Sequence, residues 1–229
     1  MDMNQTLLSR LMDDVEAHFG AYLKRILLAS TEYGMFGLPL LDALHNDLPR
    51  TRCGDCGACC NAVSIPSIEY HRIIRDLMAR QNPALIRTLL KRVLRLDQRL
   101  ADVGGENRLR CAFRDDEARQ CVIHAVRPFA CRFYGLQKAD GSRDCPHVQE
   151  LTLDPPPLTE ERMTDLQAKI LDISETHVVI EGRDPIGFFP IEFWAFRFAL
   201  GPAKALEIYR EILVPASTPL TRLWSDLNR

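Results

Sequence analysis

The sequence lacks any long apolar run. No stretch of its 229 residues approaches the roughly 20 consecutive apolar residues that a membrane-spanning helix needs. The N-terminus also lacks the pattern of a secretory signal, because it carries Asp2, Asp13 and Asp14 and its apolar residues are interrupted by Arg10. We therefore expect a cytoplasmic protein without a membrane partner.

Several other patterns are missing. The βαβ context that a thioredoxin-like redox pair requires is absent, and the sequence shows neither an internal repeat nor a glycine-rich nucleotide loop. The composition, 46% hydrophobic and 26% charged, is that of an ordinary globular protein with one large domain or two small ones. A core of this size can fold without disulfides or metal.

Cysteine is present in an unusual arrangement. The chain has 8 cysteines, and in a reducing cytosol we expect them to be metal ligands or redox thiols rather than disulfides. Cys53, Cys56 and Cys59 have the C-x2-C-x2-C spacing of the first three ligands in bacterial ferredoxin-type iron–sulfur sites. Gly57, directly after the second cysteine, can adopt a positive φ and let backbone amides point at the thiolates.

The other cysteines leave alternatives open. Cys60 adjoins Cys59, which is awkward for one tetrahedral ion because neighbouring side chains diverge. Cys145 precedes Pro146, as the remote fourth ligand of ferredoxin-type sites precedes a proline, whereas zinc would accept two cysteines from the loop and two from a hairpin. Eight thiols can form two four-thiolate sites, or one cluster with spare thiols. The predicted metal ligands are Cys53, Cys56, Cys59, Cys60, Cys111, Cys121, Cys131 and Cys145.

Hydrophobic periodicity predicts a mainly α protein with a small β-hairpin, in which a helical domain wraps around a cysteine-rich metal-binding core. The hairpin is expected over 107–124 with a cysteine on each arm, and residues 30–50 are expected to be loop with at most one short helix. Ser67, Asn82 and Thr159 are the predicted helix caps. Helices are expected over 5–28, 67–80, 83–100, 159–173, 190–200 and 202–213, with a short one after Pro128 that carries Cys131.

The chain is expected to have three parts: an N-terminal helix and loop (1–50), a cysteine-cluster metal-binding domain (51–148) and a C-terminal helical region that packs on it (149–229), reached through a stiff proline linker at 153–157. The middle part carries 17 Lys and Arg against 11 Asp and Glu, a net charge of +6, whereas the rest carries −8. Metal-bound thiolates would explain this basic excess. Most cations in its helical stretches are predicted to lie on solvated faces: Arg72, Arg75, Arg87, Lys91, Arg92, Arg95 and Arg99.

Two arginines and two histidines lie next to predicted ligands. Arg127 and Arg132 flank Cys131, where they would compensate thiolate charge and donate hydrogen bonds, or else form an ordinary salt bridge. His124 and His147 adjoin cysteine positions and could replace one as a ligand, although packing is the commoner role. The other histidines, which lack ligand spacing, are expected to be surface or packing residues: His18, His45, His71 and His177. The aromatic stripe 188–196 is predicted to pack in the core rather than to line a pocket over the metal.

Two motifs resemble the YkgJ family, also called the CxxCxxCC zinc- or iron-chelating domain. The first is the run from Cys53 to Cys60. The second comprises Cys111-Ala112-Phe113, the acidic turn at 115–117 and the run 121–134, which departs from the family at His124, where tyrosine is usual. The resemblance covers about residues 51–148. It implies metal chelation by the cysteines and says little about a reaction. Flagellin lysine N-methylases carry a similar cluster in a longer chain.

The favoured hypothesis is a protein that holds an iron–sulfur cluster, of the 4Fe-4S type, with a redox or catalytic role. The alternative is a structural or interaction module shaped by zinc, and a further alternative is a methylase-like enzyme, which would need a cofactor pocket that the sequence does not reveal. No catalytic residue is indicated, nor is a protein or small-molecule partner. Nucleic acid is not expected as a partner, because no basic strand interleaved with aromatic residues is present.

Overall fold

The computed structural model describes five main stretches of the chain, 37–48, 63–94, 106–134, 159–181 and 184–210. Shorter described pieces lie at 17, 19–21, 23–24, 51–52, 57, 60–61, 100–103, 136, 140, 142, 145 and 149–150. The described residues are mainly helical. The α-helices are α3 (Leu38–Asn46), α4 (Ser67–Ala79), α5 (Pro83–Leu94), α7 (Phe129–Phe133), α8 (Glu160–Glu181), α9 (Ile191–Leu200) and α10 (Pro202–Ile208), with a 3-10 helix at His124–Val126.

Four small antiparallel sheets of two strands each join segments of the described chain. Two are local hairpins, and the other two pair strands that are distant in the sequence. Strand β1 pairs with β7, so the two ends of the cysteine-rich segment lie side by side. The pairs are β1 (Thr51–Arg52) with β7 (Gln149–Glu150), β2 (Ser64–Ile65) with β8 (Phe189–Pro190), β3 (Leu100–Val103) with β4 (Glu106–Leu109), and β5 (Arg114–Asp115) with β6 (Gln120–Cys121).

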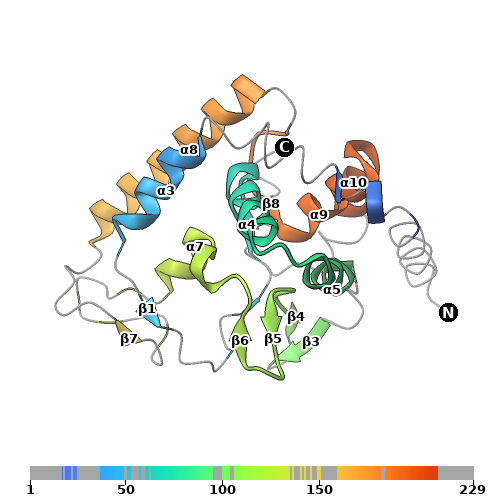
Figure 1. The fold of residues 1–229 in the computed structure, drawn as a ribbon. Coiled ribbons are helices and arrows are strands. Elements are labelled where there is room, and N and C mark those ends of the chain that lie inside the picture. Colours follow the sequence, from blue (N-terminus) through green and yellow to red (C-terminus); the bar gives the residue numbers. More distant parts are fainter. Residues whose placement is uncertain are drawn as a thin grey trace.

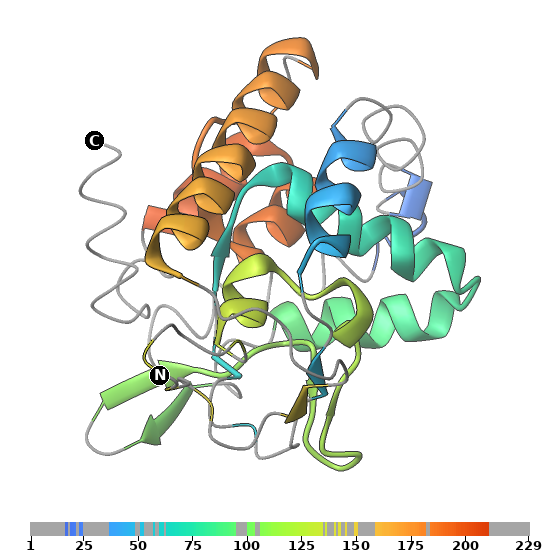
Figure 2. The same cartoon turned by 90° about the vertical axis from the view of Figure 1, so that its left-hand side faces the viewer.

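Helix α4 lies in the middle of the helical layer (Figure 1). On one side it contacts α3 and α8, which lie side by side, and on the other it contacts α5 and α9. The hairpins β3–β4 and β5–β6 both lie at one end of the molecule, below α5 and α7 in the first view, and Figure 2 shows them at the same end but apart from each other. Helix α4 therefore connects the pair α3 and α8 with the pair α5 and α9.

Two predicted helix caps are confirmed and one is wrong. The Asn82 side chain accepts a hydrogen bond from the Leu85 amide at 3.0 Å, and the Thr159 hydroxyl accepts one from Arg162 at 3.2 Å. Ser67 is the first residue of α4 instead of its cap, and Pro66 holds the cap position in an extended conformation. Proline there starts the helix through its fixed φ, without a side-chain hydrogen bond.

The predicted single hairpin over 107–124 is two hairpins. Residues 106–109 pair backwards with 100–103, and the second, shorter hairpin joins Arg114 to Cys121. The helix predicted over 83–100 is described as far as Leu94. It does not include Leu100, which belongs to strand β3. Residues 108–113 therefore do not form one continuous arm of a hairpin. They comprise the end of strand β4 and the turn that follows it.

Other elements lie as predicted or outside the described residues. Helices α8, α9 and α10 confirm the predicted C-terminal helices, and Gly201 separates the last two with a φ of +92°. Helix α3 is the short helix allowed for within 30–50. Of the predicted N-terminal helix, only a few helical residues between 17 and 24 are described. The proline linker at 153–157 lies outside the described residues.

Two hydrophobic clusters form the core. The larger one packs α4, α5 and residues of the β5–β6 hairpin against α9 and α10. Phe193, Trp194 and Phe196 are fully buried there, and the Trp194 indole donates a hydrogen bond to the Ile65 carbonyl at 3.0 Å. Most of the aromatic stripe therefore packs in the core, as predicted, and Phe188 is half-buried outside this cluster. The smaller cluster joins α3, α7, α8 and Ile68 of α4.

Arginines predicted on solvated helix faces instead make internal contacts. Arg72 is buried, and its Nε donates to Asp42 of α3 at 2.7 Å, while Arg75 donates to the other carboxylate oxygen at 2.5 Å. Arg87 lies over the Phe19 ring at 4.3 Å, and Arg92 donates to the Arg114 carbonyl at 2.9 Å. The solvated-face prediction is wrong for the buried Arg72, because other elements pack over that face of α4. Arg75 and Arg92 are partly exposed, and Arg87 and Lys91 are exposed, as predicted. No described helix combines the length and the apolar character of a membrane span.

We expect Asp42→Asn to lower the free energy of unfolding by about 1–3 kcal/mol, the range for hydrogen bonds to charged groups, because it leaves the buried Arg72 without its carboxylate. Partial burial would raise the pKa of Asp42, but the hydrogen bonds and charges of Arg72 and Arg75 outweigh it and lower the pKa. Stability from this group is therefore present above the ordinary carboxyl pKa and is lost as the pH falls through the lowered one.

Urea unfolding at neutral and acid pH measures this effect. Asp165→Asn is the matched control. Among the described residues Asp165 pairs only with Lys169, at 2.7 Å on an exposed helix face, where such pairs contribute about 0.3–0.5 kcal/mol. Equal effects of the two substitutions at neutral pH would contradict the structural role of Asp42.

Candidate metal centre

Helix α7 carries Cys131 and is anchored at its first residue by a buried carboxylate. The Phe129 amide donates a hydrogen bond to Glu69 Oε1 at 2.8 Å, and Glu69 lies on α4 with almost no exposed surface. The same oxygen lies 3.6 Å from His45 Nε2. A carboxylate at a helix N-terminus is favourable because the free amides there carry partial positive charge. Glu69 therefore fixes the position of the helix that presents Cys131.

The C-terminal half of α7 is held by Arg132. Its guanidinium donates to the carbonyl of His45 and, at 3.1 Å, to the carbonyl of Leu48, which lie at the end of α3. Carbonyls at a helix C-terminus carry partial negative charge and attract cations. These backbone contacts are a further use of Arg132, beside the two roles expected of it, thiolate compensation and a side-chain salt bridge. Its action toward a bound anion stays a prediction.

The thiols of Cys111 and Cys121 lie near enough to the Cys131 thiol to influence its charge. Burial is the main cause that raises the pKa of Cys131 well above its usual value, and repulsion from Cys111, Cys121 and Glu69 raises it further. Arg127 acts in the opposite direction. Buried thiols that repel one another as anions are stabilised when a shared cation replaces their protons.

Cys60 lies beside Cys111 through the backbone. The Cys111 amide donates to the Cys60 carbonyl at 3.0 Å, and Asn61 and Arg110 form an antiparallel bridge. The Cys60 amide in turn donates to the Gly57 carbonyl at 3.1 Å. The end of the first cysteine motif is therefore attached to the start of the second.

Two arginines lie against the first cysteine motif at Gly57. The Arg110 guanidinium donates to the Gly57 carbonyl at 3.0 Å, and the buried Arg114 side chain approaches the same glycine. Gly57 has a φ of +71°, which confirms the predicted positive φ. A Cβ at this position would lie 3.2 Å from Arg110 Nη2 and 3.3 Å from Arg114 Nε. Cationic groups thus lie beside a loop that has a cysteine on either side of Gly57.

The remaining predicted site residues are placed as follows. Cys145 is buried, and its amide donates to the Tyr134 carbonyl at 3.0 Å, directly after α7. His124 contacts the Arg127 guanidinium through its Nε2. Four predicted residues lie outside the described part of the chain: Cys53, Cys56, Cys59 and His147.

The described donor set fits a thiophilic metal. Cys111 and Cys121 lie near Cys131, and the burial of Cys131 together with these neighbours favours replacement of protons by a metal ion. Soft thiolate ligands select zinc or iron–sulfur clusters over magnesium or calcium. Zinc would act as a structural ion or a Lewis acid, and an iron–sulfur cluster would supply electron transfer.

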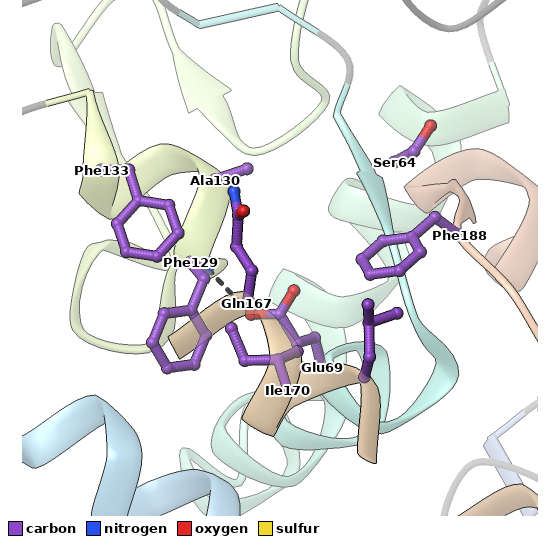
Figure 3. Close-up of a pocket in the computed structure, with 9 residues that line it drawn as sticks. Ser64, Glu69, Phe129, Ala130, Phe133, Gln167, Ile170 and Phe188 are labelled. Atoms are coloured by element: carbon purple, nitrogen blue, oxygen red, sulfur yellow. Dashed lines mark hydrogen bonds between the residues drawn. The ribbon is translucent and has the colours of Figure 1, made fainter. Parts of the chain in front are cut away.

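A cavity of about 260 Å³ adjoins α7 (Figure 3). Phe129, Ala130 and Phe133 of α7 form one wall, and Phe188 lies across from them. The polar groups of the cavity come from Ser64, Glu69 and Gln167, and the rest of its lining is mainly apolar. Glu69 and Gln167 lie between the two walls (Figure 3). Small-molecule sites have this combination of apolar walls and a few polar groups. Of the aromatic stripe, Phe188 lies at this cavity beside the cysteine-bearing helix.

Comparison with known proteins identifies the cysteine-rich segment. Residues 52–150 match the family model CxxCxxCC, described as "Putative zinc- or iron-chelating domain". This segment is therefore similar to a CxxCxxCC domain. The match begins and ends at the strands β1 and β7, which pair with each other. No curated protein and no solved structure matches the chain.

Sequence reasoning missed three residues of the cysteine-rich segment that organise the site. Glu69 was not singled out because a helical glutamate usually faces solvent. Arg110 and Arg114 lie within the hairpin predicted over 107–124, a pattern that assigns them no role at the site. Their nearness to Cys111 in the sequence was an available signal, since basic residues adjoining predicted thiolate ligands can offset their charge. That they meet at Gly57 followed only from the fold.

We expect Gly57→Ala to weaken metal retention by the cysteine-rich segment. An alanine at this φ costs about 1–2 kcal/mol, and its Cβ would press on both arginines beside the loop. Metal content per chain after purification, with thermal unfolding of the same samples, measures the effect. Gly20→Ala is the control, because Gly20 is exposed in a helical stretch and a Cβ there meets nothing within 4 Å. Metal content unchanged in Gly57→Ala would contradict the expected constraint.

Proposed function

We propose that the cysteine-rich segment holds an iron–sulfur cluster through its cysteines and uses it in a redox or catalytic role. The observation that carries the proposal is the gathering of cysteines from separate segments. Cys60 lies beside Cys111 through the backbone, and Cys111 and Cys121 lie near Cys131. The C-x2-C-x2-C spacing of the first motif favours a cluster over a single ion. The match to a zinc- or iron-chelating domain supports metal binding and leaves the metal open.

The surroundings of the thiols also support a cluster. A cluster with four thiolates carries net negative charge. Three arginines lie near the described parts of the cysteine motifs: Arg110 and Arg114 at Gly57, and Arg127 near Cys131. Cations and N–H donors near cluster sulfurs tune the reduction potential. The adjoining cavity offers room for a small molecule beside α7, which favours a redox or catalytic role over a purely structural one.

A zinc-stabilised structural or interaction module is the second candidate. The four described sheets have only two strands each, and isolated two-stranded pairs are marginally stable in water. A tetrahedral zinc ion could hold such short elements together. The described residues show no feature that favours the methylase-like alternative.

Nucleic acid is not proposed as a partner. The basic excess of the cysteine-rich segment is partly used inside the protein, since Arg72, Arg75, Arg92, Arg110 and Arg132 all donate to internal acceptors. Side chains engaged in this way are less available to phosphate groups. The same contacts explain why a segment of net charge +6 can lie within a compact protein.

Purification without oxygen separates the two candidates. An iron–sulfur protein should be brown, with iron and acid-labile sulfide in comparable amounts, whereas a zinc protein is colourless and contains zinc without sulfide. Elemental and sulfide analysis of one sample gives the answer. Stoichiometric zinc without iron or sulfide, from cells supplied with iron, would overturn the proposal.

We expect serine in place of any ligand cysteine to weaken metal retention roughly tenfold or more, since even groups that only orient ligands change affinity about 10- to 100-fold. Elemental analysis of each variant measures this. Val122→Thr is the control, because it changes a partly buried neighbour of Cys121 without removing a thiol. The six variants to compare are Cys53→Ser, Cys56→Ser, Cys59→Ser, Cys111→Ser, Cys121→Ser and Cys131→Ser. Full metal content in all of them would contradict the proposed ligands.

Chelation should loosen the cysteine-rich stretches 51–66 and 101–121 and leave most helices in place. These stretches contain few apolar residues, so packing does not offset their chain entropy of roughly 1–2 kcal/mol per residue. The helices around α4 are stabilised by two buried clusters. Circular dichroism and hydrogen exchange with and without chelator measure the two parts separately. Complete loss of helicity would show instead that the metal holds the entire fold.

A further inference from the structure

A second group of possible metal ligands lies outside the cysteine set. His71 comes from α4, His177 from α8, and Asp184 from the segment between α8 and β8. One ligand atom of each lies within 4.8 Å of those of the other two. Both histidines are buried, and the Asp184 side chain is 5% exposed. Three separate segments therefore bring donor atoms to one enclosed point.

His177 is the unusual member of this group. Its side chain is fully buried, yet neither ring nitrogen has a hydrogen-bond partner among the described residues. Its ring lies edge-on to that of His71, with 5.4 Å between the centroids. A buried polar group without a partner destabilises the fold, so a ligand that accepts the nitrogen lone pair would remove that penalty. Burial, chiefly, lowers the pKa of His177 to about 4, so the ring is neutral near pH 7, the form that binds metal.

The other two residues are arranged as metal ligands are. His71 Nε2 and Asp184 Oδ2 lie 3.0 Å apart, about the separation of two donors that sit at right angles roughly 2.0–2.2 Å from one ion. The second oxygen, Asp184 Oδ1, accepts a hydrogen bond from Arg197 Nε at 2.7 Å. Arg197 therefore fixes the carboxylate, as partners of metal ligands usually do.

This group is separate from Cys131, the cysteine on α7. Glu69 and His71 stand two residues apart on α4, which places them about 200° apart around the helix axis. Glu69 meets α7, whereas His71 faces α8 and the segment that follows it. Two imidazoles and one carboxylate are hard-to-borderline donors that suit zinc or ferrous iron rather than a cluster.

We propose that His71, His177 and Asp184 bind a divalent transition-metal ion, such as Zn²⁺ or Fe²⁺, at a buried site distinct from the cysteines. The ion joins α4, α8 and the segment that leads to β8, and so attaches the C-terminal helices to the middle of the fold. An ion-free His–Asp–Arg network is the competing arrangement that the experiment must distinguish.

Cobalt titration of the full-length protein, with its cysteine-bound metal retained, tests the proposal. Wild type should take up one additional equivalent whose spectrum lacks the thiolate-to-cobalt charge-transfer bands, and added Zn²⁺ should raise its Tm. His177→Leu and Asp184→Asn should each lose the additional equivalent and the rise in Tm, and keep the cysteine-bound metal. Ser174→Ala is the control, because Ser174 is buried one turn before His177 and bonds only to the Ile170 carbonyl among the described residues.

The cobalt titration of the wild-type protein tests the proposed site even if a variant does not fold. No additional equivalent in wild type, or thiolate bands in its spectrum, would overturn the proposal. Retention of the additional equivalent by both folded ligand variants would do the same. Stabilisation of ion-free protein by His177→Leu, with no uptake in wild type, would favour the ion-free network.

Discussion

The burial of helix α4 is the constraint on which the described structure depends. Its first two turns are enclosed by other elements, so their polar side chains have to find partners inside the protein. Glu69 bonds to the first amide of α7, His71 to Asp184, and Arg72 to Asp42. Each partner belongs to a different element. The desolvation cost of three polar residues on one helix is thus offset by contacts that position α7, the segment before β8, and α3.

Cys121 and Cys131 lie on short elements that would not be stable alone. Helix α7 has five residues, and the hairpin beside it has two residues in each strand, so neither would be stable alone. Glu69 and Arg132 hold the two ends of α7, and Arg80 and Arg92 donate to carbonyls next to the hairpin. The larger elements thereby hold the thiols in place, and a bound metal would add to that framework.

Charge explains why basic residues surround these thiols. The pKa of Cys131 is raised by burial and by neighbouring acids, so deprotonation without a cation is unfavourable. Arg127 opposes that rise, and Arg110 lies beside the loop between Cys56 and Cys59. The proposed histidine site differs, since its donors are two imidazoles and one carboxylate that Arg197 already orients. Two kinds of donor set therefore suit two kinds of metal within one fold.

The sequence by itself determined the elements whose signals are local: the helices begun by Asn82 and Thr159, the break at Gly201, the positive φ of Gly57 and the cysteine motifs. Each rests on a few adjacent residues and their backbone preferences. Only the tertiary structure decided which polar residues are buried. Glu69, His71, Arg72 and His177 read as ordinary helix residues, because burial depends on what packs over a helix, and the covering segments lie far away in the sequence.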